Sequence, residues 1–199
     1  SVGYTSLWNT LGLYIATHKG IPYKKRVETL HNALKSIILI ANSHRELIKN
    51  LQDLDAQEGL QQQTYILSAP KDTICIPQAY IVPQLFTDVI DHFKDNAIEM
   101  TPIEKDSLMQ VHSYMLKTTR DSLPLIDYKT VRAQLIQKNQ KVAIRKGDLL
   151  VSTQQKGRKY LLETLEPHAN NSFMRTGKLP FLPTPKDSLW VYPIFSIEK

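Results

Sequence analysis

The sequence predicts an α+β protein in which a strand and a long helix precede a β-rich segment that carries one short helix. Apolar residues from Val27 to Leu51 recur mostly at spacings of three and four, which indicates one face of a helix. After residue 63 the pattern changes to short runs of β-branched and aromatic residues separated by Pro, Asp, Asn and Gly, which is typical of strands and turns. We therefore expect two domains, residues 1–60 and 64–199.

The first domain begins with a compact apolar run at 11–15, which favours a strand. A turn at 19–22 follows, and Pro22 suits the first turn of the helix that comes next. Gly59 is a helix stop signal. One helix with one apolar face must bury that face against another element, so we expect self-association through it.

The second domain contains short runs with strand character, at 64–68, 73–82, 111–117, 130–137 and 148–153. Between them, residues 85–93 place four apolar side chains on one face, which predicts a short helix after Pro83. Four prolines between Pro180 and Pro193 favour a tail that runs extended over the surface.

The charge pattern gives little support to nucleic-acid binding. The net charge is +6, but the 25 Lys and Arg residues are scattered among 19 acidic ones. The only tight basic cluster is at 24–26, and no aromatic residues suited to base stacking are interleaved with it. No apolar run reaches membrane-spanning length, so we expect no membrane partner.

The residues that could bind a metal or act as nucleophiles form no recognisable motif. Cys75 is the only cysteine, which excludes an intramolecular disulfide, and its neighbours Ile74 and Ile76 predict a buried thiol. The six histidines match no strong zinc motif. From the residues alone, the chain is an α+β module that lacks a complete catalytic or metal-binding constellation.

Three ordered sets of segments resemble bacterial zinc carboxypeptidases of the carboxypeptidase A-like family. Residues 12–27 resemble a strand that ends in Glu-Thr-His and leads through Lys-Pro-Tyr into a helix carrying Arg-Val. Residues 77–83, followed by 96–98, are similar to a Pro-x-Ala-Tyr-x-x-Pro motif, a hydrophobic helix and His-Gly-Ile. The closing segments, at 146–154, 161–167 and 171–173, resemble the pattern Gly-x-x-x-Val-x-x-x-Gln, then Leu-Leu-Glu-Pro-x-x-x-Asp-Ser.

This resemblance implies that the full-length parent is a zinc-dependent hydrolase that removes residues from the ends of peptides. The family's zinc ligands precede the segment that resembles 11–17, so zinc is expected in the parent and no metal on this chain. Residues 1–60 would then be the end of an α/β peptidase domain, and residues 64–199 an accessory β-rich domain. Kinship also implies a periplasmic or secreted location.

The resemblance places Ala16 at the position of the family's general-base glutamate. A methyl group cannot accept a proton, so we expect this chain to be inactive. An alignment slip, a deliberate inactivating substitution and a naturally inactive member all remain open. His18 matches the family's histidine; it either lines a substrate pocket or hydrogen-bonds within the turn before the helix.

Two further hypotheses stand beside the peptidase relationship. The parent is a pseudoenzyme that binds peptides or cell-wall fragments without cleaving them, or, less favoured, the chain is a basic nucleic-acid binder. Glu163, Glu166 and Asp148 lie in the accessory segment, where surface or structural roles are expected rather than acid–base catalysis.

Overall fold

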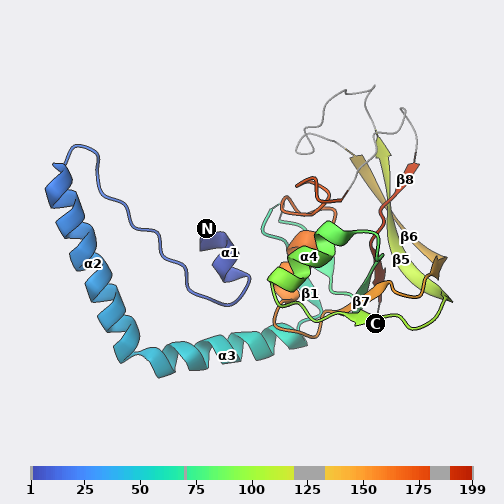
Figure 1. Cartoon of the computed structure of the whole chain (residues 1–199), viewed down its shortest axis with the longest axis horizontal. Helices are drawn as coiled ribbons and strands as arrows, with labels where there is room; N and C mark the ends of the chain where they lie inside the picture. The colour runs from blue at the N-terminus through green and yellow to red at the C-terminus, as the bar shows by residue number, and fades with distance from the viewer. Residues whose placement is uncertain (1, 70, 119–132, 180–188, 199) are drawn as a thin grey trace. The chain divides into compact units, whose positions relative to one another are not determined.

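The computed structural model describes residues 2–69, 71–118, 133–179 and 189–198 (Figure 1). The chain divides into two compact units, Ser1–Gln61 and Gln62–Lys199. The first unit contains three helices within its described residues: α1 (Val2–Ser6), α2 (Tyr23–Ser43) and α3 (Arg45–Gln61). Neither α2 nor α3 contains a buried residue.

The strand predicted at 11–15 is not formed, because residues 10–18 have no regular secondary structure. A strand needs a neighbouring strand to satisfy its backbone groups, and the described residues of the first unit offer none. Leu11, Leu13 and Tyr14 are accordingly exposed. The prediction was wrong because an apolar run forms a stable strand only beside a partner strand.

The single long helix of the prediction is two helices, separated at His44. Ser43 Oγ donates a hydrogen bond to the Ile40 carbonyl oxygen at 2.9 Å, and His44 Nδ1 lies 3.0 Å from the same oxygen. Short polar side chains that compete for backbone groups in this way weaken helices. The helix therefore ends where Asn42, Ser43 and His44 follow one another.

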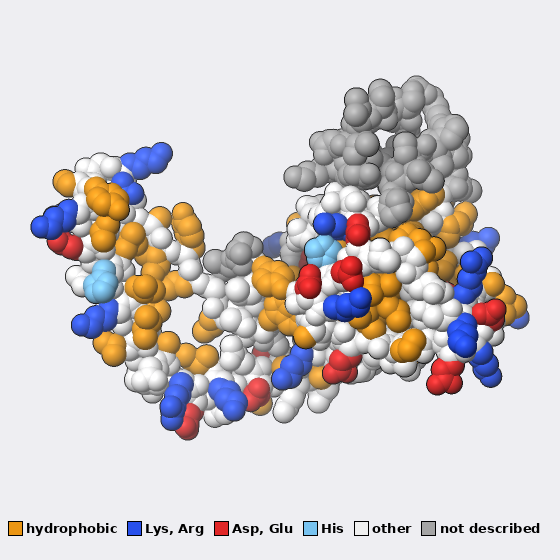
Figure 2. Space-filling model, viewed as in Figure 1, with side chains coloured by type: hydrophobic (Ala, Val, Ile, Leu, Met, Phe, Trp, Pro, Cys, Tyr) orange, Lys and Arg blue, Asp and Glu red, His pale blue; other side chains and the backbone are white. Residues whose placement is uncertain are grey.

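Hydrophobic side chains gather along α2 (Figure 2). Leu34, Ile38, Leu39 and Ile40 are each more than half exposed. Self-association through this apolar surface stays a prediction.

The second unit contains strands with two inserted helices. Its described elements are β1 (Thr64–Ile66), β2 (Thr73–Cys75), β3 (Ala79–Val82), α4 (Thr87–Asp95), β4 (Thr101–Pro102), β5 (Ser107–Thr118), β6 (Ala133–Ile144), β7 (Leu149–Ser152), α5 (Arg158–Leu165), β8 (Leu189–Val191) and β9 (Phe195–Ile197). Within the described residues, β1 and β2 form a small sheet, and the large sheet has the order β4-β7-β3-β9-β5-β6, with β8 also paired to β5. The strand pairs are antiparallel, and the fold is α+β as predicted.

Most predicted strands are present, with shifted bounds. The run at 73–82 is divided into β2 and β3 around Pro77, which has no backbone N–H to donate. Residues 133–137 of the run at 130–137 belong to β6, and residues 130–132 lie outside the described residues. The predicted helix at 85–93 begins two residues later, at Thr87.

Among the described elements of the second unit, β4, α5, β8 and β9 were not predicted. Helix α5 is buried on nearly every side, so it lacks the polar face that reveals an amphipathic helix. The tail does not simply run over the surface, because β9 lies between β3 and β5 and the side chains of Tyr192 and Ile194 are buried. Pro193 is accommodated between β8 and β9, whereas Pro180, Pro183 and Pro185 lie outside the described residues.

The two helices of the second unit pack against each other through aromatic side chains. The ring of Phe93 on α4 contacts Tyr160 on α5 edge-on, with centroids 6.4 Å apart, and lies 5.9 Å from Phe173. Ile81, Val111 and Ile144 form a second buried cluster on the large sheet. Burying an apolar side chain of this size contributes roughly 1.5–3 kcal/mol, so these clusters give the second unit a core of its own.

Helix α4 ends in a Schellman motif. The Ile98 N–H donates to the Phe93 carbonyl at 2.9 Å, and the Ala97 N–H donates to the Lys94 carbonyl at 3.0 Å. This geometry places Ala97 in the left-handed region, with a φ of 51°. Alanine is strained there, and glycine is the usual residue.

We predict that Ala97→Gly stabilises the protein by about 1 kcal/mol, because glycine removes the strain of the left-handed conformation. Urea unfolding of the two proteins measures the difference. Gly147→Ala is the matched opposite change, since Gly147 has a φ of 94° and an added Cβ would lie 2.8 Å from Gln84 Oε1. Equal stabilities for the parent protein and Ala97→Gly would contradict the left-handed geometry.

The fragment 62–199 should fold without the first unit, because its buried clusters are internal to it. Circular dichroism should give this fragment a cooperative thermal transition close to the main transition of the full chain. Fragment 1–61 should show no cooperative transition, since its two long helices bury no side chain. A disordered 62–199 fragment would contradict the division of the chain into these units.

Candidate functional site

The second unit contains a pocket of about 820 Å³ between the small sheet and the large sheet. Its wall on one side is β2 with the residues that flank it, and on the other side β5, β6 and β9 contribute. The segment that follows α5 supplies Glu166 and His168. Ligand sites in proteins typically measure about 300–1,000 Å³, and this pocket lies within that range.

Glu166 is the buried polar centre of this pocket. Its side chain is 3% exposed, and its two oxygens accept hydrogen bonds from different strands. Tyr80 Oη on β3 donates to Oε1 at 2.5 Å, and Tyr114 Oη on β5 donates to Oε2 at 2.9 Å. Gln137 Nε2 on β6 in turn donates to Tyr114 Oη at 3.2 Å. The network therefore ties three strands to the end of α5.

Burial determines the protonation of this network. It raises the pKa of the Glu166 carboxyl, although the hydrogen bonds from Tyr80 and Tyr114 oppose the change. Burial and the nearby Glu166 also raise the pKa of Tyr80 and of Tyr114. The tyrosines therefore stay protonated and remain donors at neutral pH.

His168 and Asp72 lie at the same pocket. His168 Nδ1 is 3.9 Å from Asp72 Oδ2, and the imidazole meets the Tyr114 ring edge-on with centroids 5.3 Å apart. Burial lowers the pKa of His168, Asp72 only partly opposes this change, and the positive charge of Arg175 lowers the pKa further. The imidazole is therefore mainly neutral at neutral pH.

Cys75 is exposed at the pocket, so the prediction of a buried thiol was wrong. The side chains of β2 alternate between its two faces, and Ile74 takes the buried face. The flanking isoleucines therefore indicate the opposite face for Cys75. On the other wall, His112 Nδ1 lies 3.9 Å from a carboxylate oxygen of Glu198.

The described lining of the pocket carries negative rather than positive charge. Asp72, Glu166 and Glu198 contribute carboxyl groups, and no Lys or Arg is among the described residues that line it. The rest of the chain is rich in basic residues and has a net charge of +6. The pocket therefore differs in electrostatic character from the protein as a whole.

Strand β2 offers backbone groups beside this pocket. The Leu67 N–H donates to the Asp72 carbonyl oxygen, and the Ile76 N–H donates to the Gln63 carbonyl oxygen. These two bonds show which residues of β2 direct their backbone groups toward β1. Because antiparallel pairing alternates, Thr73 and Cys75 direct their backbone groups away from β1. No further strand among the described residues pairs with that edge.

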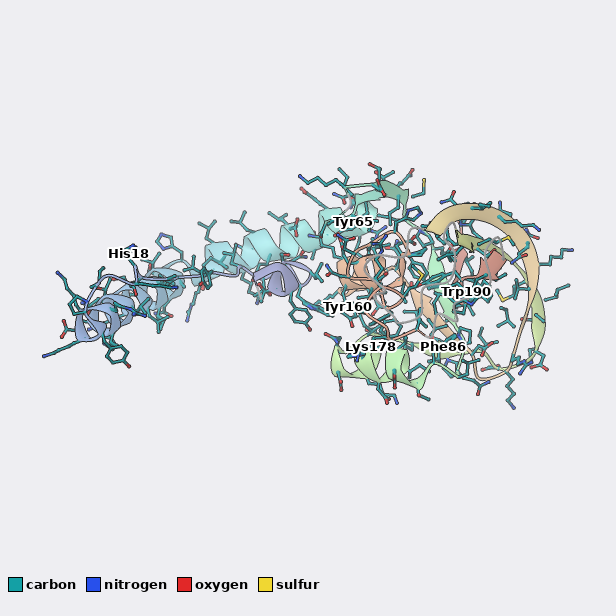
Figure 3. All side chains as sticks on the ribbon, turned by 90° about the horizontal axis from the view of Figure 1, so that it is seen from above. His18, Tyr65, Phe86, Tyr160, Lys178 and Trp190 are labelled. Atoms are coloured by element: carbon teal, nitrogen blue, oxygen red, sulfur yellow. The ribbon has the colours of Figure 1, made fainter. Side chains whose placement is uncertain are left out.

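The two residues that the resemblance singled out belong to the first unit and are not among the residues that line the pocket. Ala16 is exposed in the irregular segment before α2. His18, labelled in Figure 3, is also exposed, and its Nδ1 accepts a hydrogen bond from the Gly20 N–H at 3.1 Å. This contact is the one expected if His18 shapes the turn before the helix; a role in substrate binding stays untested.

The implied zinc ion does not fit the described part of this chain. No group of three His, Cys, Asp or Glu side chains is arranged there to hold a metal ion. Within the same residues, no helix is both long and apolar enough to cross a membrane.

Comparisons with known proteins give no family for this chain: no family model, curated protein or solved structure matches it.

The pocket residues were largely missed from the sequence. Tyr114 and His168 carry no motif, and they meet only because β5 and the segment after α5 are brought together by folding. Glu166 and Glu163 were expected at the surface or in structural roles, and both are buried. Glu163 Oε1 accepts hydrogen bonds from Ser68 and from Tyr65, which Figure 3 labels. Glu163 thereby attaches α5 to the small sheet.

The raised pKa of Glu166 predicts a pH-dependent effect of Glu166→Gln. The folded protein binds this proton more tightly than the unfolded chain, so its stability falls as pH rises from about 4.5, the ordinary value, through the raised pKa. The free energy of unfolding of Glu166→Gln relative to the parent should therefore increase over this range. The change amounts to about 1.4 kcal/mol for each unit by which the pKa is raised.

Urea unfolding at several pH values measures this difference. Glu104→Gln, at an exposed carboxyl outside the pocket, is the matched control and should show no comparable trend. A pH-independent difference for Glu166→Gln would mean that burial does not disfavour the ionised carboxyl.

Proposed function

We propose that residues 62–199 form a peptide-binding module that holds an extended segment without cleaving it. The observation that carries this proposal is that β2, one edge of which pairs with no other strand among the described residues, forms one wall of the pocket around Glu166. A peptide added beside β2 gains main-chain hydrogen bonds from the edge and places alternate side chains in the pocket.

The backbone of Thr73 and Cys75 supplies the hydrogen-bonding groups for such a peptide. Both residues are exposed, so an incoming strand displaces solvent there rather than protein. The buried face of β2 is fixed by Ile74, which is 9% exposed. Binding would therefore add a third strand to the small sheet, whose position is fixed by the buried side chain of Ile74 on its other face.

The module is also proposed to belong to the C-terminal part of a zinc carboxypeptidase-like parent. Residues of the resembling motifs, far apart in the sequence, contact one another. Tyr80 of the Pro-x-Ala-Tyr motif hydrogen-bonds Glu166 of the Glu-Pro motif, and their burial makes this bond part of the core. Asn96 Nδ2 lies 3.4 Å from Tyr160 Oη, beside the closing motif.

Glycine positions of the family motifs add support. The family has glycine in His-Gly-Ile where this chain has Ala97, and Ala97 adopts a φ of 51°, which favours glycine. Gly147 of the closing motif has a φ of 94°. At both motif positions the backbone adopts a conformation that favours glycine. This agreement is expected if the chain and the family share a fold.

Binding without cleavage is the favoured form of the proposal because of Ala16. Under the resemblance this position belongs to the general base, and an alanine side chain has no atom that accepts a proton. Peptide hydrolysis by a complete parent remains the alternative, and it would require a different base.

Fluorescence polarisation with a library of labelled hexapeptides, blocked at both ends, tests the proposed binding to the full chain. Cys75→Trp should weaken binding at least tenfold, because an indole at this exposed position fills the pocket beside the β2 edge. The matched control Leu108→Trp introduces the same side chain at an exposed residue outside the pocket and should leave binding unchanged.

Methylating alternate backbone nitrogens of the best peptide provides a second check. One set of alternate positions should abolish binding and the other should be tolerated, since only one set pairs with β2. Equal losses from both tryptophan variants, or no binding by any peptide, would contradict the proposal.

A further inference from the structure

We infer that the pocket of residues 62–199 selects a positively charged ammonium group of the bound peptide. The inference rests on the proposed peptide binding and names the chemical class that the pocket prefers. The ammonium group can come from a lysine-type side chain or from a free peptide N-terminus, which carry the same charge and the same three donors.

The charges that face the pocket favour a cation. Asp72 and Glu198 stand at its exposed margin, and Glu166 lies at its buried end. The two imidazoles do not reverse this balance: burial keeps His168 mainly neutral, and His112 lies 3.9 Å from Glu198. Of the 25 Lys and Arg residues in the chain, none that the structure describes lines the pocket.

The hydrogen-bonding groups also suit an ammonium donor. Each oxygen of Glu166 accepts one tyrosine hydrogen bond, and a carboxylate oxygen can accept two. Tyr114 Oη already donates to Glu166 and accepts from Gln137. The remaining acceptor capacity of the buried network therefore lies largely on Glu166, which an ammonium group can satisfy with charge-assisted hydrogen bonds.

The same arrangement disfavours the C-terminal carboxylate of a peptide. Recognition of a carboxylate needs cationic donors or a cluster of backbone N–H groups, and the described lining residues provide no Lys or Arg. A carboxylate would also be repelled by the exposed carboxylates of Asp72 and Glu198. The pocket is therefore expected to bind an ammonium group and to disfavour the C-terminal carboxylate, which is the end of a peptide that a carboxypeptidase acts on.

Four peptides of one length and otherwise neutral sequence test the inference on the full chain by isothermal titration calorimetry. The first is blocked at both ends with a central lysine, and the second replaces that lysine by norleucine, which keeps the aliphatic chain without the charge. The third and fourth contain norleucine and carry a free N-terminal amine or a free C-terminal carboxylate, respectively.

We expect the lysine peptide or the free-amine peptide to bind at least tenfold more tightly than the blocked norleucine peptide, and the tighter of the two identifies the source of the ammonium. The carboxylate peptide should bind no better than the blocked one. Because the attraction is electrostatic, the advantage of the amine should shrink as salt is added.

Asp72→Asn and Glu166→Gln should each reduce the advantage of the amine at least threefold, and Glu104→Gln should preserve it. Asp72 is exposed, so Asp72→Asn keeps the test available if Glu166→Gln does not fold. Equal binding of all four peptides would overturn the inference while leaving peptide binding in place. Absence of binding by all four would count against the proposed function itself, and tighter binding of the carboxylate peptide would reverse the assigned selectivity.

Discussion

The hydrogen bonds of Glu166 hold the second unit and its pocket together. Tyr80 and Tyr114 come from β3 and β5, which are separated in the sheet by β9, and both donate to one carboxyl group. The hydroxyl of Tyr192, which lies between β8 and β9, donates to the carbonyl oxygen of Leu165, the residue before Glu166, at 2.7 Å. A buried carboxyl group left without these donors would be costly, so the strands and the end of α5 must adopt one arrangement.

The same network gives the pocket its chemical character. A buried acid that is fixed by tyrosines cannot turn away from a ligand, and low-dielectric surroundings strengthen the attraction of its ionised form for a cation. Burial also keeps the neighbouring His168 mainly neutral, which leaves the negative character of the wall in place. The fold of the second unit and the proposed binding of an ammonium group therefore both depend on Glu166, which lies in a segment that resembles a family motif.

The sequence predicted the helices and strands better than it predicted which of them pack or pair with one another. Periodicity located α4 and most strands of the second unit, because half-buried elements repeat their apolar residues regularly. It missed α5, whose burial on nearly all sides removes that signal, and it placed a strand at 11–15 where no partner strand exists among the described residues. The apolar stripe predicted one continuous helix, whereas the structure has two helices separated at His44.

The pocket was the least predictable part. Tyr114, Glu166 and His168 are brought together by long-range pairing of strands, and no short motif encodes that proximity. Cys75 was assigned to the buried face, although the alternation of β2 directs Ile74 there and leaves the thiol exposed. The resemblance placed both Glu166 and Tyr80 within motifs. That Tyr80 and Tyr114 donate hydrogen bonds to Glu166 is known only from the structure.

The most direct test of the proposed binding is a structure of the full chain with a bound lysine-containing peptide. We expect the peptide to extend the small sheet along β2, with main-chain hydrogen bonds to Thr73 and Cys75 and its ammonium group within hydrogen-bonding distance of Glu166 or Asp72. A peptide bound away from β2, or one whose carboxylate occupies the pocket, would contradict the proposed binding.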